Sequence, residues 1–100
     1  MNVLLVEDEV GLADVLARYV GARGHKVTSV ATAQGAVDSV NAHWPDAVVL
    51  DVNLPDGSGW DVLRRIGPEK CGGLRVVVIS AAPLSQKRLD EFKPARWFLK

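Results

Sequence analysis

The sequence predicts an α/β domain built on a parallel sheet that helices cover on both faces. Two observations support this prediction. Short apolar runs of strand length alternate with longer segments in which apolar residues recur every three or four positions, as on one face of a helix. The chain has 100 residues, 48% of them hydrophobic and 24% charged, which is typical of one globular domain. Strands that alternate with helices favour parallel pairing through helical crossovers.

The strands are indicated by apolar, often β-branched runs. We expect them at residues 3–6, 27–30, 47–50 and 74–79, with the start of a fifth at residues 97–99. The first helix follows the first strand, and Gly21 and Gly24 mark its end. Its apolar positions are Leu12, Ala13, Leu16, Ala17 and Val20.

Capping residues indicate where the other helices begin. Thr32 can cap a second helix, and Ser58 with Asp61 forms a capping-box pattern for a third. Ser85 is expected to cap a short polar fourth helix. Leu84 and Leu89, on either side of this cap, have the spacing of a hydrophobic staple. Residues 52–59 have the composition of a turn. The apolar face of the second helix comprises Ala33, Ala36, Val37 and Val40.

Three acidic residues stand where predicted strands end. Glu7 and Asp8 follow the first strand, and Asp51 follows the third. We expect a doubly wound, flavodoxin-like sheet of order 2-1-3-4-5, in which these two strands are neighbours and sites lie outside the carboxyl ends. Two unit charges 4 Å apart repel by roughly 4 kcal/mol at an effective dielectric of 20, so a clustered set needs compensation. Oxygen ligands suit Mg²⁺. The alternative is that these are ordinary loop acids near a helix N-terminus.

Composition and charge exclude several classes of function. The net charge is zero, which argues against nucleic acid as the main partner. The apolar runs are far shorter than a membrane span, and the N-terminus has no basic segment of a signal peptide, so we expect a cytoplasmic protein without a membrane partner. The single cysteine, Cys71, excludes an internal disulfide and is expected to be an ordinary thiol.

Three segments resemble response-regulator receiver domains of two-component signalling. They are residues 3–9 (VLLVEDE), residues 51–57 (DVNLPDG) followed by Gly59, and residues 80–82 (SAA). The resemblance spans nearly the whole chain. It implies that the chain takes a phosphoryl group from a sensor histidine kinase or a histidine phosphotransfer protein and signals by changed binding of a downstream protein. It implies no dedicated enzyme, and it allows a dimer.

The resemblance also implies a role for each matching residue. Asp51 would accept the phosphoryl group, and Ser80, at the end of the fourth strand, would contact its oxygens. Mg²⁺ would be bound by Glu7, Asp8, Asp51 and the backbone carbonyl of Asn53. Phe98 matches an aromatic position whose rotamer changes on activation, and an ordinary core aromatic is the alternative.

The end of the sequence departs from the family pattern. Receiver domains carry a lysine after the fifth strand, three residues beyond the aromatic position. Counted from Phe98 it would fall one residue after Lys100, and Lys100 itself would serve only if the register shifted by one. We therefore expect one domain over residues 1–100, C-terminally incomplete, without the final helix and without an effector domain. The uncovered sheet face should expose apolar surface.

Three other functions compete with phosphorylation-dependent signalling. The chain could be a receiver-like interaction module that works without phosphate. An aspartyl-phosphate phosphatase of the haloacid dehalogenase kind would need a general-acid aspartate where Asn53 stands. A flavin-binding domain would need a phosphate-binding loop after the first strand, where residues 7–9 are all acidic. The last two are disfavoured on these grounds.

Overall fold

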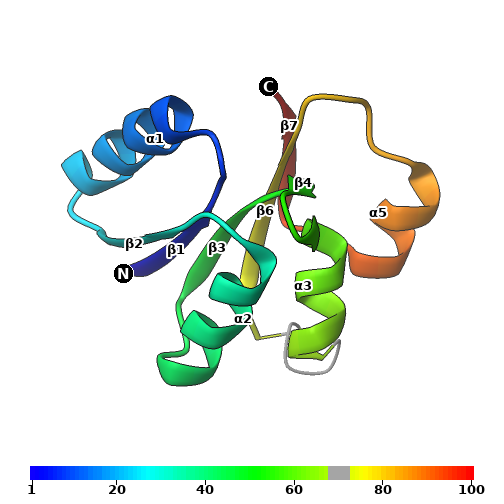
Figure 1. Cartoon of the computed structure of the whole chain (residues 1–100), viewed down its shortest axis with the longest axis horizontal. Helices are drawn as coiled ribbons and strands as arrows, with labels where there is room; N and C mark the ends of the chain where they lie inside the picture. Colours follow the sequence, from blue (N-terminus) through cyan, green and yellow to red (C-terminus); the bar gives the residue numbers. More distant parts are fainter. Residues whose placement is uncertain (68–72) are drawn as a thin grey trace.

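The computed structural model describes residues 1–67 and 73–100, so Cys71 lies outside the described residues. Its elements alternate along the chain as expected (Figure 1). In order they are β1 (Asn2–Val6), α1 (Val10–Ala22), β2 (Lys26–Val30), α2 (Ala33–Ala42), β3 (Ala47–Asp51), β4 (Asn53–Leu54), β5 (Gly57–Ser58), α3 (Gly59–Ile66), β6 (Arg75–Ser80), α5 (Gln86–Phe92) and β7 (Arg96–Leu99).

The main sheet has five strands in the order β2-β1-β3-β6-β7, all parallel. This confirms the predicted doubly wound architecture, because β6 and β7 are the fourth and fifth strands of that sheet. The chain continues to β2 on one side of β1 and crosses to β3 on the other, so the order reverses between β1 and β3. The carboxyl ends of these two strands therefore form the switch point at which such sheets bind ligands.

The helices form a layer on each face of the sheet. Helices α2, α3 and α5 lie on one face, and α1 lies on the other (Figure 1). The main core lies between the sheet and the α2–α3 layer, where the Trp60 and Phe92 rings stack 5.1 Å apart. Its most buried members are Leu4, Val6, Ala36, Val48, Leu50, Val62, Leu63 and Val78. None of the described helices combines the length and apolar character needed to cross a bilayer.

Helix α1 and the edge strand β7 both carry exposed apolar side chains, among them Val15 and Leu99. Helix α1 packs on β1 and β2 but contains no buried residue. The edge strand β7 is exposed along its whole length, and the Phe98 side chain is 56% exposed. Phe98 is therefore not a core aromatic, and that alternative was wrong. Its strand has a neighbour on one side only, β6, among the strands of the sheet.

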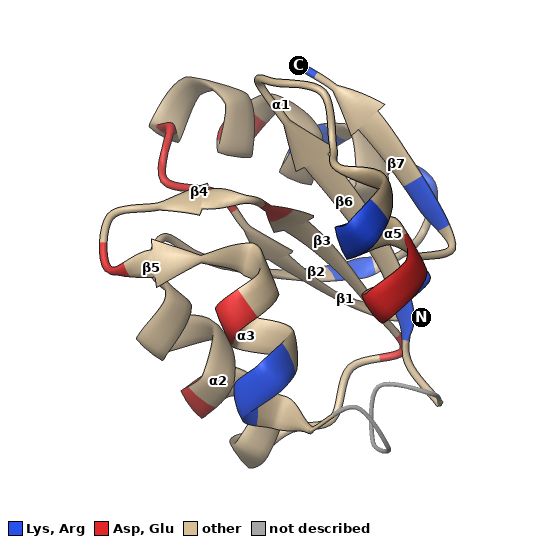
Figure 2. Ribbon diagram, turned by 90° about the vertical axis from the view of Figure 1, so that its right-hand side faces the viewer, with Lys and Arg blue, Asp and Glu red and all other residues tan. Residues whose placement is uncertain are grey.

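The predicted turn at residues 52–59 contains two short strands that the sequence pattern did not indicate. β4 and β5 pair antiparallel, with Asn53 opposite Ser58 and Leu54 opposite Gly57. Figure 2 shows this hairpin next to α2 and α3, away from the edge strand β7. We call residues 52–58 the acceptor loop, because they directly follow Asp51. The ladder also extends one residue further than expected, since Asp51 pairs with Ile79 and is the last residue of β3.

The predicted caps of α2, α3 and α5 are confirmed. The Thr32 hydroxyl oxygen accepts a hydrogen bond from the Gly35 N–H, at 2.9 Å. Ser58 and Asp61 form a complete capping box at the start of α3, with each side chain accepting from the other residue's N–H. Ser85 caps α5. The fold therefore begins its helices where the sequence places short polar acceptors.

The capping box predicts an acid-dependent contribution to stability. The Ser58 backbone N–H and then its hydroxyl bind the Asp61 carboxylate and lower the pKa of that group. The folded protein then binds fewer protons than the unfolded chain, so this stability is present above the unfolded pKa and is lost as the pH falls through the folded one. We expect Asp61→Asn to lower the Tm relative to the native protein near pH 6, and the difference to shrink below about pH 4. Thermal unfolding at several pH values measures this; a pH-independent difference would contradict it.

Gly59 is required at its position because the backbone of β3 lies against it. A Cβ there would overlap the Asp51 carbonyl oxygen and would lie 3.0 Å from the Leu50 Cγ atom. We expect Gly59→Ala to destabilise the fold by about 1–3 kcal/mol or more, as overpacking does. Gly11→Ala is the matched control, because a Cβ at Gly11 would meet nothing within 4 Å. In helix α1 it should stabilise by about 0.5–1 kcal/mol. Urea unfolding measures the stability of both variants. Equal free energies of unfolding for Gly59→Ala and Gly11→Ala would contradict the expectation.

Candidate functional site

Carboxylates from the ends of two neighbouring strands converge at the switch point. Ligand oxygens of Glu7, Asp8 and Asp51 all lie within 4.8 Å of one another. Glu7 and Asp51 are buried, at 2% and 1% exposure, while Asp8 is exposed. The convergence arises because β1 ends at Val6, beside the end of β3. Glu7 and Asp8 therefore lie outside the strand, where successive side chains need not point to opposite faces of the sheet. The predicted acidic cluster is therefore present.

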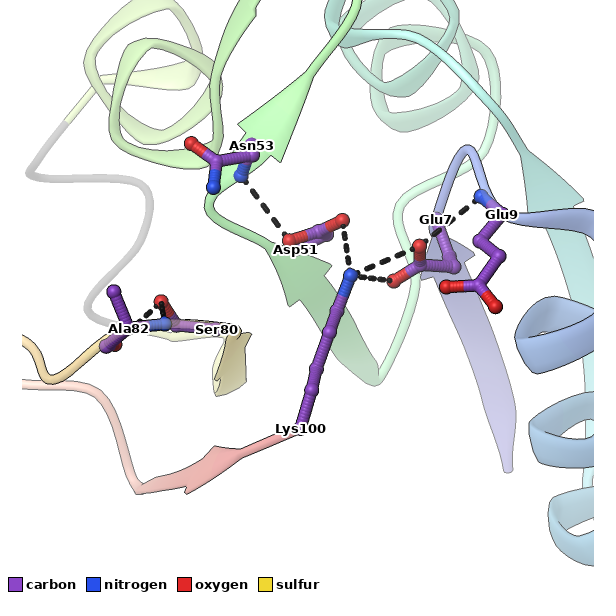
Figure 3. Close-up of polar contacts among 7 residues, drawn as sticks. All are labelled: Glu7, Glu9, Asp51, Asn53, Ser80, Ala82 and Lys100. Atoms are coloured by element: carbon purple, nitrogen blue, oxygen red, sulfur yellow. Dashed lines mark hydrogen bonds and ion pairs between the residues drawn. The ribbon is translucent and has the colours of Figure 1, made fainter.

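Lys100 places its ammonium between the two buried acids (Figure 3). Its Nζ atom lies 2.8 Å from Asp51 Oδ2 and 3.1 Å from each carboxylate oxygen of Glu7. The Lys100 N–H donates to the Ser80 carbonyl at 2.7 Å, which fixes the residue just beyond the end of β7. A lysine at the end of the sequence, which the sequence analysis placed in the site only after a shift of register, therefore reaches both buried acids.

The electrostatics of the site reflect both burial and pairing. Burial raises the pKa of the Glu7 carboxyl, and this outweighs the hydrogen bonds from the Glu9 N–H and from Lys100. Burial by itself would lower the pKa of Lys100, but its hydrogen bonds to Asp51 and Glu7 and their charges raise it. The ammonium therefore stays charged and partly neutralises the acids around it.

The oxygen atoms present suit a hard divalent cation. Glu7 Oε1 accepts hydrogen bonds from the Glu9 N–H and from Lys100. The other oxygen, Oε2, is buried and forms an ion pair with the Lys100 Nζ at 3.1 Å, but it accepts no hydrogen bond from any described residue. An oxygen without a hydrogen bond, beside two more carboxylates and without sulfur or imidazole ligands, fits Mg²⁺. Glu7, Asp8 and Asp51 could hold such an ion.

Three hydrogen bonds connect the start of the acceptor loop to β3, to β6 and to the first residue of α3. The Asn53 N–H donates to Asp51 Oδ1 at 3.1 Å (Figure 3). The Val52 N–H donates to the Ile79 carbonyl, and the Gly59 N–H donates to the Val52 carbonyl at 2.8 Å. These contacts place the Asn53 backbone beside the Asp51 carboxylate. The loop's conformation therefore governs what surrounds this carboxylate.

Ser80 lies on the same rim, but its hydroxyl is bonded elsewhere. Ser80 Oγ donates to the Ala82 carbonyl at 2.7 Å and accepts from the Ala82 N–H at 3.2 Å (Figure 3). It would have to leave this turn in order to contact a group on Asp51. The residue is buried at the end of β6, the strand that neighbours β3.

The sequence analysis named Lys100 only as the alternative that required a shift of register by one residue. The family places its lysine three residues after the aromatic position, and counting started from Phe98. Counting back from Lys100 instead reaches Trp97. The start of the count could not be decided from the sequence because Trp97 and Phe98 are adjacent aromatics.

The family assignment follows from comparison with known proteins. The sequence model of the response regulator receiver domain matches residues 3–93. The chain belongs to this family, and it is therefore a receiver domain of two-component response regulators.

Individual relatives agree with this assignment. The chain is 39% identical over 94 residues to the transcriptional regulatory protein KdpE of Mycobacterium tuberculosis, and 35% identical over 89 residues to the probable transcriptional regulatory protein TcrX of the same organism. The two alignments cover 88% and 89% of this chain but only 38% of each relative. The chain thus spans well under half the length of the curated relatives it matches.

Solved structures share the fold. The non-phosphorylated HemR receiver domain of Leptospira biflexa matches with a TM-score of 0.87 and 32% identity, over 99% of this chain and 81% of that one. The response regulator TrrA of Thermotoga maritima, solved in complex with Mg²⁺ and BeF, matches with a TM-score of 0.86 over 99% of this chain and 85% of that one. At 20% identity the second likeness shows the fold alone.

Proposed function

We propose that this chain is a phosphoacceptor, in which Asp51 takes a phosphoryl group from a phosphohistidine of a sensor histidine kinase or a histidine phosphotransfer protein. The observation that carries the proposal is the buried Asp51 carboxylate, 2.8 Å from the Lys100 ammonium and clustered with oxygens of Glu7 and Asp8. Phosphoryl transfer mainly requires positioning and neutralisation of charge. This site has a nucleophile, a fixed cation and ligands for a second one.

Glu7, Asp8, Asp51 and the Asn53 carbonyl would hold the Mg²⁺ ion. Bound there, the ion would neutralise the acids and the incoming phosphoryl oxygens. The Glu7 Oε2 atom, which accepts no hydrogen bond from a described residue, and the cluster of carboxylate oxygens support this assignment. The Mg²⁺ in the TrrA complex belongs to that protein and makes the same ion a reasonable first probe here.

The remaining residues would respond to the phosphoryl group. The Lys100 ammonium, already hydrogen-bonded to Asp51, would pair with a phosphoryl oxygen. The Ser80 hydroxyl would leave Ala82 and donate to another. Phe98 remains our predicted switch aromatic, and the position of Lys100 adds Trp97 as a second candidate. Both side chains are about half exposed, so a change of rotamer meets little packing resistance.

The output would be changed binding of a downstream protein, with the phosphoryl group later lost to water. In this proposal the chain acts in the cytoplasm, directly contacts neither nucleic acid nor membrane, and is not a dedicated enzyme. The alternative, an interaction module independent of phosphate, was considered because the lysine seemed to be missing. Lys100 lies in the site, so that reason no longer holds.

The test is uptake of a phosphoryl group from acetyl phosphate, measured by intact mass. With Mg²⁺ we expect one phosphoryl group per chain, and with EDTA in place of Mg²⁺ we expect none. No uptake by a folded protein at saturating Mg²⁺ would reject the proposal and favour the phosphate-independent module. Uptake in EDTA would reject the role of the metal.

A further inference from the structure

The tip of the acceptor loop is tied to a helix that the phosphoryl chemistry itself does not involve. Asp56 lies in the two-residue turn between β4 and β5. Its Oδ1 atom accepts a hydrogen bond from the Ala33 N–H at 2.7 Å, and its Oδ2 atom accepts one from the Gln34 N–H at 3.0 Å. Ala33 and Gln34 are the first two residues of α2, whose N–H groups have no partner within the helix. A carboxylate 22 residues away in sequence therefore caps α2 together with Thr32.

The contact is electrostatically favourable as well as geometrically good. These two backbone hydrogen bonds lower the pKa of the Asp56 carboxyl, and the nearby Arg65 charge adds to the effect. The negative carboxylate also faces the positive end of the α2 dipole. At neutral pH the anchor is therefore fully charged.

Helix α2 provides a fixed attachment point for this carboxylate. The Gln34 side chain oxygen accepts a hydrogen bond from Arg65 of α3 at 2.6 Å. The apolar side of α2 is buried in the main core through Ala36, Val37 and Val40. Movement of the loop tip relative to the sheet is therefore opposed by the packing of two helices.

The other end of the same loop forms the surroundings of Asp51. Asn53, whose carbonyl is a proposed Mg²⁺ ligand, lies three residues before Asp56 and donates its N–H to Asp51. Residues 53–54 and 57–58 are paired across the hairpin, so the tip and the base move together. Fixing the tip consequently restricts where the Asn53 carbonyl can lie.

We propose that Asp56 is a positioning residue, which strengthens Mg²⁺ binding by pinning the acceptor loop to the N-terminus of α2. This rests on the proposed function, because it takes Mg²⁺ to be the ligand of the cluster around Asp51. A loop held in its binding conformation loses less freedom when the ion binds, so the apparent affinity rises with the population of that conformation.

Two variants at this position separate the anchor from a simple charge effect. Asp56→Ala removes both acceptor atoms and the charge, whereas Asp56→Asn removes the charge and keeps one carbonyl acceptor for α2. Asp46→Asn is the remote control. Asp46 also accepts a backbone hydrogen bond, from the Asn2 N–H at 2.7 Å, but it precedes β3, at the opposite end of the strand from Asp51.

The experiment is titration calorimetry with Mg²⁺ alone, without phosphodonor, on proteins whose cooperative unfolding has been checked. We expect Asp56→Ala to raise the Mg²⁺ Kd about tenfold, as loss of a supporting contact outside the ligand set does. Asp56→Asn should lie between that variant and the native protein, and Asp46→Asn should match the native protein. Acetyl phosphate uptake should need more Mg²⁺ in Asp56→Ala, with a near-native rate at saturation.

The outcomes distinguish this inference from the proposed function. A native Kd in Asp56→Ala would overturn the inference and leave the function standing. Equal losses in the Asp56→Ala and Asp56→Asn variants would also overturn it, in favour of long-range charge. If the native protein binds no Mg²⁺, the proposed function fails and the inference fails with it. If Asp56→Ala does not fold, a Kd for Asp56→Asn above that for Asp46→Asn supports the inference, and equal values overturn it.

Discussion

Asp51→Asn is expected to abolish the uptake of a phosphoryl group from acetyl phosphate. An amide is a far weaker nucleophile than a carboxylate, and the substitution also removes one negative charge from the proposed Mg²⁺ site. The side chain has nearly the same shape and is 1% exposed, so the packing around it should be retained. Intact mass after incubation with Mg²⁺ and acetyl phosphate should show no added group in this variant and one in the native protein.

Asp46→Asn provides the matched control for that measurement. It removes the same charge from an aspartate that bonds to the Asn2 N–H and precedes β3, at the other end of the strand. Full uptake is expected in this control. A phosphoryl group that still appears on the Asp51→Asn protein would place the acceptor at another residue. Peptide mapping of the modified native protein would then identify that residue.

Lys100→Gln is expected to destabilise the protein in the absence of Mg²⁺ and to make its stability strongly dependent on that ion. The substitution leaves Glu7 and Asp51 buried side by side without their shared cation. The Lys100 side chain is 21% exposed. The expected loss is therefore about 1–3 kcal/mol, between the values for exposed and fully buried ion pairs. Saturating Mg²⁺ should recover much of it, because a ligand that binds only the folded state stabilises that state.

Urea unfolding in EDTA and in Mg²⁺ measures this prediction. Lys87→Gln is the control, because Lys87 is an exposed lysine of α5. It should change stability little in either buffer. If Lys100→Gln unfolds like the native protein in EDTA, the ammonium does not compensate the buried acids. If Mg²⁺ stabilises both proteins equally, the ion and Lys100 do not share the same carboxylates.

The sequence by itself determined the order of the elements and the end of the sheet at which the site lies. Helical and strand periodicities are local, and the caps Thr32, Ser58 and Ser85 act within three residues, so these features could be predicted without contacts. The cluster of Glu7, Asp8 and Asp51 followed from a general rule, because the carboxyl ends of neighbouring parallel strands lie together.

Only the tertiary structure decided which side chains complete the site. The register of β7 brings the Lys100 ammonium to Asp51, and it is set by the pairing of β7 with β6 and by the hydrogen bond from the Lys100 N–H to Ser80. This register could not be predicted by counting residues from an aromatic position, because two aromatic residues are adjacent there. The exposure of Phe98 depends on which elements cover its strand. Asp56 reaches α2 across 22 residues, and the Ser80 hydroxyl turns to Ala82 instead of Asp51. Such contacts depend on how distant segments are packed, and the periodicity of a single segment carries no information about that packing.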